Sequence, residues 1–178
     1  ALQPNVFWYQ ESFAGADNER WRAPASASDS LTLGRGLFVY FFGDVAEDNR
    51  YNNALPDTLV VTGQEHEGNG TLFEFPVTYT EEGDQGWNFV SNPFGATLNW
   101  SSAGWTKTNI DNTIYVWSPS ANSNNGEFLT WNGSSGTLGN GLIRPFQGFW
   151  VKATGPNPVL RVNKSAKTSG GTFYQKEI

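Results

Sequence analysis

The chain has 178 residues, which is enough for one domain that buries roughly 70% of its unfolded surface without covalent staples. It has no cysteine, which excludes disulfides and thiol chemistry, and its net charge of -6 with scattered Lys and Arg argues against a nucleic-acid partner. Eight Trp, 20 Gly and only 16% charged residues indicate an all-β extracellular domain, since Gly, Asn and β-branched residues disfavour helices.

The first half of the chain is a series of short candidate strands. Residues 6–13 predict an edge strand, and residues 37–42, apolar on both alternating faces, predict a central strand covered on both sides. Residues 58–62 predict another strand. Residues 72–80 alternate with a period of two, so one face should be buried and the other wet. Pro76 lacks an amide donor, which places that strand at a sheet edge or at a bulge.

Short strands and turn signals continue in the second half. Residues 87–90 predict a strand that Asn92-Pro93 stops, and residues 96–105 predict a helical turn. Further strands are predicted at 114–117, 128–131, 143–146, 148–153, 159–162 and 172–174. Asn-Gly pairs at 69–70, 125–126, 132–133 and 140–141 suit tight hairpin turns. The pattern predicts one antiparallel, jelly-roll-like β-sandwich with little helix over residues 1–178, in which 168–178 is a closing strand or tail.

An ordered set of aromatic motifs runs through the second half of the chain. The motifs are Gly86-Trp87-Asn88, Asn92-Pro93-Phe94, Leu98-Asn99-Trp100, Ile114-Tyr115-Val116-Trp117, Trp131-Asn132-Gly133 and Pro145-Phe146-Gln147-Gly148-Phe149-Trp150-Val151-Lys152. Their order resembles an accessory β-module of secreted and cell-surface proteins of Bacteroidetes-type bacteria, over about residues 30–168. The resemblance implies a region of a large exported protein, commonly cargo of type IX secretion, upstream of a C-terminal sorting domain.

Two further features fit this setting. The sorting domain is missing here and position 1 is not Met, so we expect a processed or excised part of a secreted or cell-surface protein, with neighbouring domains as partners. No apolar run reaches the roughly 20 residues that a membrane span needs.

The sequence contains no recognisable catalytic constellation. The single histidine, His66, sits between two glutamates in a Gly-flanked loop, and no Gly-x-Ser-x-Gly elbow accompanies it. One His cannot build a zinc site. The acids fall mostly in turn-like stretches, unlike the facing carboxylates of a glycosidase. We therefore expect a protein that is not an enzyme.

Aromatic residues near polar turns make a polysaccharide or other glycan the first specific candidate ligand. An indole offers a rigid apolar surface for the C–H face of a sugar, and nearby amide, carboxylate and guanidinium groups would hydrogen-bond its hydroxyls. The candidate binding residues are Trp100, Trp105, Trp117, Trp131, Asn109, Asp111, Asn132 and Arg144. The alternative is that these Trp side chains fill the interior, as we expect for Trp87 and Trp150 inside strands. Trp105, predicted in a loop, is the leading candidate.

An acidic loop after the second predicted strand is a candidate calcium site. Asp44, Glu47, Asp48 and Asn49 carry the oxygen ligands that Ca²⁺ prefers, although without EF-hand spacing. A solvated loop and a structural calcium both remain open, and no other cofactor is expected. The sequence thus predicts a non-catalytic accessory module that binds carbohydrate, and the alternative is a structural or adhesion spacer without a small ligand.

Overall fold

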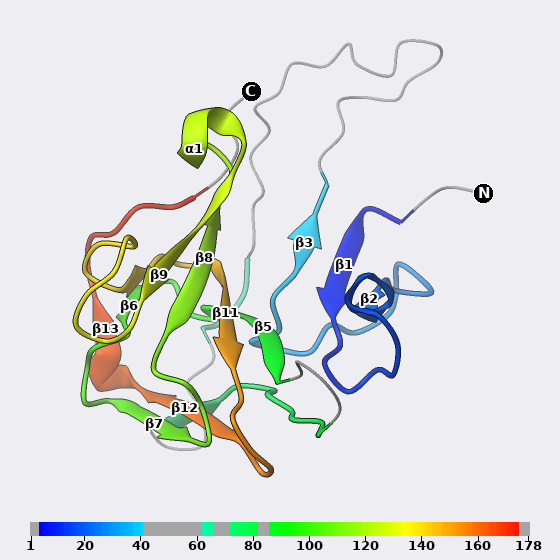
Figure 1. Ribbon diagram of the computed structural model, residues 1–178, viewed down its shortest axis with the longest axis horizontal. Helices are drawn as coiled ribbons and strands as arrows, with labels where there is room; N and C mark the ends of the chain where they lie inside the picture. Colours follow the sequence, from blue (N-terminus) through cyan, green and yellow to red (C-terminus); the bar gives the residue numbers. More distant parts are fainter. Residues whose placement is uncertain (1–3, 41–61, 66–71, 82–85, 175–178) are drawn as a thin grey trace.

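The computed structural model describes residues 4–40, 62–65, 72–81 and 86–174. In these ranges the chain forms thirteen short strands, all paired antiparallel (Figure 1). Helical structure is limited there to α1 (Ala121–Asn124) and the 3₁₀ turns η1 (Asp17–Arg20) and η2 (Lys164–Ala166). The predicted all-β antiparallel fold with little helix is confirmed.

The largest sheet has four strands and two different faces. In pairing order, its strands are β5 (Trp87–Ser91), β11 (Gly148–Lys152), β8 (Ile114–Ser118) and β9 (Glu127–Trp131). Because side chains alternate along a strand, Val90, Phe149 and Val116 point inward and are buried, with exposed fractions of 1% or less. Trp150 and Trp117 belong to the opposite, outer face, where exposure is greater.

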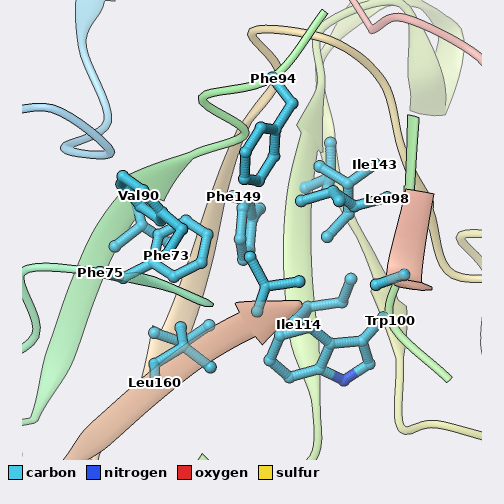
Figure 2. Close-up of a cluster of buried hydrophobic side chains, with 14 of the residues drawn as sticks. Phe73, Phe75, Val90, Phe94, Leu98, Trp100, Ile114, Ile143, Phe149 and Leu160 are labelled. Carbon is cyan, nitrogen blue, oxygen red and sulfur yellow. The ribbon is translucent and has the colours of Figure 1, made fainter. Parts of the chain in front are cut away.

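Two smaller sheets cover the inner face of the four-stranded sheet. One consists of β4 (Leu72–Glu74), β12 (Val159–Asn163) and β7 (Trp105–Thr108), and the other of β10 (Leu142–Ile143), β6 (Thr97–Asn99) and β13 (Lys167–Thr168). Figure 2 shows Phe149 in the middle of the core, with Phe73 and Phe75 on one side and Leu98 and Ile143 on the other. This packing is a β-sandwich. The jelly-roll order stays a prediction, because the described strands form short sheets rather than two continuous ones.

A third group of strands, the N-terminal layer, lies beside β5 (Figure 1). It contains β1 (Val6–Tyr9), β2 (Trp21–Arg22) and β3 (Phe38–Val39), in the order β2-β1-β3. Its aromatic side chains pack edge-on against the outer face of the large sheet. The ring centroids of Tyr9 and Trp150 are 4.9 Å apart, and those of Trp21 and Phe89 are 6.0 Å apart. The N-terminal layer therefore covers the β5–β11 half of that face.

A buried carboxylate joins the N-terminal layer to the sandwich. Glu11, 3% exposed, accepts hydrogen bonds from the hydroxyls of Thr78 and Thr80 (both 2.7 Å) and from the backbone amides of Thr80 (2.8 Å) and Gly86 (3.1 Å). Burial by itself would raise the pKa of Glu11, but these donors outweigh it together, and its pKa lies below its ordinary value. Glu11 thus stays ionised through hydrogen bonds.

Several sequence predictions are confirmed and others are wrong. The strand predicted at 72–80 is shorter than expected, because β4 ends at Glu74, before Pro76; it lies at a sheet edge as predicted, since it pairs only with β12 among the described strands. Residues 37–42 do not form a covered central strand in the part described: β3 is two residues long, pairs with β1 alone and leaves Phe38 41% exposed. Residues 58–61 lie outside the described ranges.

Three other corrections concern the second half. Residues 96–105 contain strand β6 and a turn instead of a helical turn, because β6 pairs with both β10 and β13. Residues 172–174 form no strand, and the closing strand is β13. Trp87 and Trp150 do not fill the sandwich interior. They belong to the outer face, since their neighbours in the strand point inward.

Candidate functional site

Trp100 is part of the hydrophobic core. Its exposed fraction is 0%, its ring centroid lies 4.7 Å from that of Trp105 and 6.1 Å from that of Phe149, and its Nε1 donates a 2.7 Å hydrogen bond to the carbonyl of Asn112. A sugar stacks only on an indole face that reaches the surface. The prediction that Trp100 binds a sugar is therefore corrected: this residue stabilises the fold.

Trp105 lies in strand β7, and the predicted loop at this position is wrong. Its ring stacks on Phe75 at 5.7 Å with an interplanar angle of 21°, and its Nε1 donates to the carbonyl of Asn99 at 2.8 Å. The side chain is partly buried against the core. Both its polar atom and its ring are engaged, so Trp105 is no longer the leading candidate.

Trp131 and Asn132 belong to a hydrogen-bonded rim at the end of β9. The Nε1 atom of Trp131 donates to the hydroxyl of Ser101 at 2.9 Å, and that hydroxyl donates to the carbonyl of Gly133 at 2.8 Å. The Oδ1 atom of Asn132 accepts from the backbone amides of Ser134 and Ser135. These hydrogen bonds connect turns of the fold and engage the indole N–H of Trp131 and the Oδ1 atom of Asn132.

The other predicted polar residues are dispersed. Asn109, with a φ of 51°, donates to the carbonyl of Pro156 at 2.7 Å, and Asp111 accepts from the amide of Thr113 at 2.6 Å. Both are exposed; Asp111 caps a local turn, whereas Asn109 joins its turn to the segment before β12. Arg144 instead donates to the carbonyl of Gly170, on the segment after β13, at 3.2 Å. The eight predicted residues therefore do not converge on one site.

Lys107 is a half-buried cation that the sequence did not single out. Its Nζ lies 3.8 Å from the centroid of the Trp100 ring and donates to the Trp100 carbonyl (3.2 Å) and to Oδ1 of Asn112 (2.8 Å). Burial lowers the pKa of Lys107 to about 8. Because both of its hydrogen bonds go to groups of the fold, the Trp100 carbonyl and the Asn112 side chain, we assign Lys107 a structural role beside Trp100.

Trp117 differs from the other predicted tryptophans because it is exposed. Its side chain is 41% exposed on the outer face of β8, and Phe128, its partner in the register on β9, is 46% exposed. The two rings meet edge-to-face, with centroids 4.9 Å apart. This pair lies on the β8–β9 half of the outer face, which the N-terminal layer does not cover.

An Asn-rich turn lies beside the Trp117 ring. Asn122, Ser123 and Asn124 have φ values of 51°, 56° and 68°, so α1 includes a left-handed turn. Gly126 closes this turn, and a Cβ at that position would lie 2.1 Å from the Trp117 ring. In the described part of the chain, the side-chain amides of Asn122 and Asn124 are exposed and make no hydrogen bond. We call Trp117, Phe128 and these two amides the Trp117 face.

The sequence signals for this face were incomplete. Trp117 was predicted from its nearness to polar turns, but Phe128 and the Asn122–Asn124 turn were missed. The register that pairs Phe128 with Trp117 depends on the turn between β8 and β9. The Asn-Ser-Asn-Asn-Gly run was a usable signal for a turn with positive φ.

The structure does not test the calcium prediction. Asp44, Glu47, Asp48, Asn49 and His66 lie outside the described residues. Within the ranges that are described, no three His, Asp or Glu side chains gather closely enough to hold a metal ion. The same ranges contain no helix whose length and apolarity would let it cross a membrane.

Comparison with known proteins yields no match: no family model, no curated protein and no solved structure is similar to this chain. The resemblance of its aromatic motifs to an exported accessory module therefore stays an expectation. Any function has to be argued from the residues and their geometry.

Proposed function

We propose that this chain is a non-catalytic accessory module of a secreted or cell-surface protein, and that it binds carbohydrate at the Trp117 face. The observation that carries the proposal is an exposed indole that the fold holds in place. Trp117 is 41% exposed and is packed against both Phe128 and the backbone of Gly126. In the part of the chain that the structure describes, the exposed side-chain amides of Asn122 and Asn124, on the turn that Gly126 closes, make no hydrogen bond.

The chemistry of this face suits a sugar. The C–H face of a pyranose buries apolar area on a ring surface, and a rigid aromatic side chain gives up little conformational entropy when it does so. Side-chain amides offer both donors and acceptors, which is what a ring of hydroxyls requires. Aromatic and amide groups carry no proton-transfer chemistry near neutral pH, so the proposal is binding and not hydrolysis.

The test is affinity electrophoresis of the whole chain in gels containing soluble polysaccharides, together with pull-downs on insoluble ones. Trp117→Ala is expected to weaken retardation at least about tenfold, which corresponds to about 1.4 kcal/mol of binding free energy. Phe128→Ala should weaken retardation less than Trp117→Ala, because it keeps the indole and removes only the ring that packs against it. Phe173→Ala is the matched control, because Phe173 is 45% exposed on the segment after β13. Circular dichroism of each variant checks that the fold persists.

The outcomes separate the alternatives. Unchanged retardation of Trp117→Ala on a glycan that binds the parent chain contradicts the proposed face. No retardation by any member of a broad glycan panel favours the structural or adhesion spacer. A parallel series with EDTA tests the predicted calcium site at Asp44, Glu47, Asp48 and Asn49. Removal of calcium by EDTA would abolish glycan binding only if the metal supports the binding site.

A further inference from the structure

A second concave site lies where the N-terminal layer meets the sandwich. It is a cleft of about 310 Å³ whose lining includes Trp8, Gln10, Ser12, Arg35, Pro76 and Phe89. This volume is in the lower part of the range for small-molecule sites. We call it the Arg35 cleft. It shares no residue with the Trp117 face.

The backbone holds Arg35 rigidly at the edge of β5. Arg35 forms a bridge with Val90, and its carbonyl accepts a 3.0 Å hydrogen bond from the hydroxyl of Ser91. The flanking residues are bonded to the same strand: the amide of Gly36 donates to the Phe89 carbonyl, and the Gly34 carbonyl accepts from the Ser91 amide, both at 2.9 Å. A Cβ at Gly36 would lie 2.5 Å from the Phe89 ring. The glycine thus permits the close approach that fixes Arg35.

The guanidinium of Arg35 has an aromatic neighbour and, among the described residues, no ion-pair partner. Its Cζ lies 5.5 Å from the centroid of the Trp8 ring. Among the residues that the structure describes, no carboxylate lies within ion-pair distance of it, and its side chain makes no hydrogen bond. Burial also lowers the pKa of Arg35. A partly desolvated guanidinium with free donors suits a carboxylate, which it can bind through two parallel hydrogen bonds.

Glu11 also lines the cleft, but it does not serve as the partner of Arg35. Its two oxygens accept from Thr78, Thr80 and Gly86, and hydrogen bonds rather than a cation lower its pKa. Gln10 and Ser12 are different, because their side chains make no hydrogen bond within the described part of the chain. They would be available for hydroxyl groups of a ligand.

We propose that the Arg35 cleft binds a carboxylate-bearing sugar, the uronate residue of an acidic glycan. The carboxylate pairs with Arg35, and hydroxyls interact with Gln10 and Ser12 beside the Trp8 and Phe89 rings. Hydroxyl and amide groups next to a single cation favour a polyhydroxylated acid over an acidic peptide, which would present several carboxylates. This inference does not rest on the Trp117 face, so either site can fail alone.

The test is NMR titration of the intact chain with trigalacturonate, trimannuronate and triguluronate. Each is added to about 10 mM, which nearly saturates a site with a Kd of about 1 mM. The signals followed are the indole N–H of Trp8 and the Nε–H of Arg35. The methyl ester of each trimer is the neutral control ligand, and triglutamate is the peptide control. Arg35→Gln should weaken uronate binding at least about tenfold, and Arg35→Lys less, because Lys keeps the charge without the fork.

Arg22→Gln is the matched protein control. Arg22 is exposed in the same N-terminal layer, where its guanidinium stacks on Phe13 at 4.5 Å, and the substitution removes the same charge. Uronate binding that Arg35→Gln abolishes and Arg22→Gln retains supports the proposal. Equal binding of the methyl esters, stronger binding of triglutamate, equal loss in the Arg22 variant, or no shift at either signal with any of the three uronates would each overturn it.

Discussion

Trp100, Trp150 and Trp117 occupy three environments that local sequence separates only in part. Trp100 follows β6 and is wholly buried, Trp150 lies under the N-terminal layer, and Trp117 is 41% exposed. Strand alternation correctly separates inward from outward residues in β8 and β11. It cannot tell which half of an outer face a distant segment will cover. For that reason Trp117 was predicted as a binding residue on the same grounds as Trp100, and only one of the two is available.

The residue-scale prediction concerns Glu11. Glu11→Gln keeps the shape but removes the charge that four donors bind, so we expect the free energy of unfolding near neutral pH to fall by about 1.5–3 kcal/mol. The folded-state pKa of Glu11 lies below its ordinary value of 4.5. Its stabilisation is therefore complete above that pH and is lost as the pH falls through the folded-state pKa.

Urea unfolding measured over a series of acidic pH values checks this prediction. The parent chain should lose stability on acidification more steeply than Glu11→Gln. Glu81→Gln is the control, because Glu81 is exposed and should leave the parent slope intact. Identical slopes for the parent chain and Glu11→Gln would show that the carboxylate does not contribute in this way.

At the scale of elements, the strands found from the sequence are those that carry their own signal. β5, β8, β9, β11 and β12 are five residues long and alternate or carry aromatic and branched side chains. The missed strands β6, β7 and β13 are shorter and rich in Thr, Lys and Asn. They are strands because distant partners hold them: β6 pairs with β10 and with β13. Such pairing overrides weak local preference.

Gly126→Ala tests the turn that positions Trp117. The position has a φ of 82°, and a Cβ there would lie 2.1 Å from the indole, so the substitution should strain the backbone and displace the ring. Gly139→Ala is the matched control, because Gly139 has a φ of 78° but no atom within 4 Å of the added Cβ. The control should cost about 1–2 kcal/mol of stability for the left-handed conformation alone.

We expect Gly126→Ala to cost more than Gly139→Ala and to shift the indole N–H signal of Trp117. It should also weaken retardation by any glycan that the parent chain binds. Equal stability losses in the two variants, with an unshifted Trp117 signal, would mean that the turn does not hold the ring.

For the whole molecule, sequence patterns predicted a sandwich but not the N-terminal layer on its outer face. The contacts that seat this layer join Tyr9 and Trp21 to Trp150 and Phe89, and they leave no periodic signal in either segment. The Arg35 cleft arises from the same long-range docking, since β1 provides one wall and the sandwich the other. A site formed between two layers could not be predicted before the layers were known to meet.

If the N-terminal layer is an integral part of the fold, its aromatic contacts should be energetically coupled to the large sheet. A double-mutant cycle of Trp21→Leu with Phe89→Leu, whose rings lie 6.0 Å apart, should give a coupling free energy of about 0.5–1.5 kcal/mol in urea unfolding. Trp21→Leu with Phe128→Leu is the control cycle, because Phe128 lies on β9, at the opposite edge of the sheet from β5. Those two effects should add to within about 0.5 kcal/mol. Additivity in both cycles would mean that the contact between Trp21 and Phe89 does not couple the N-terminal layer to the large sheet.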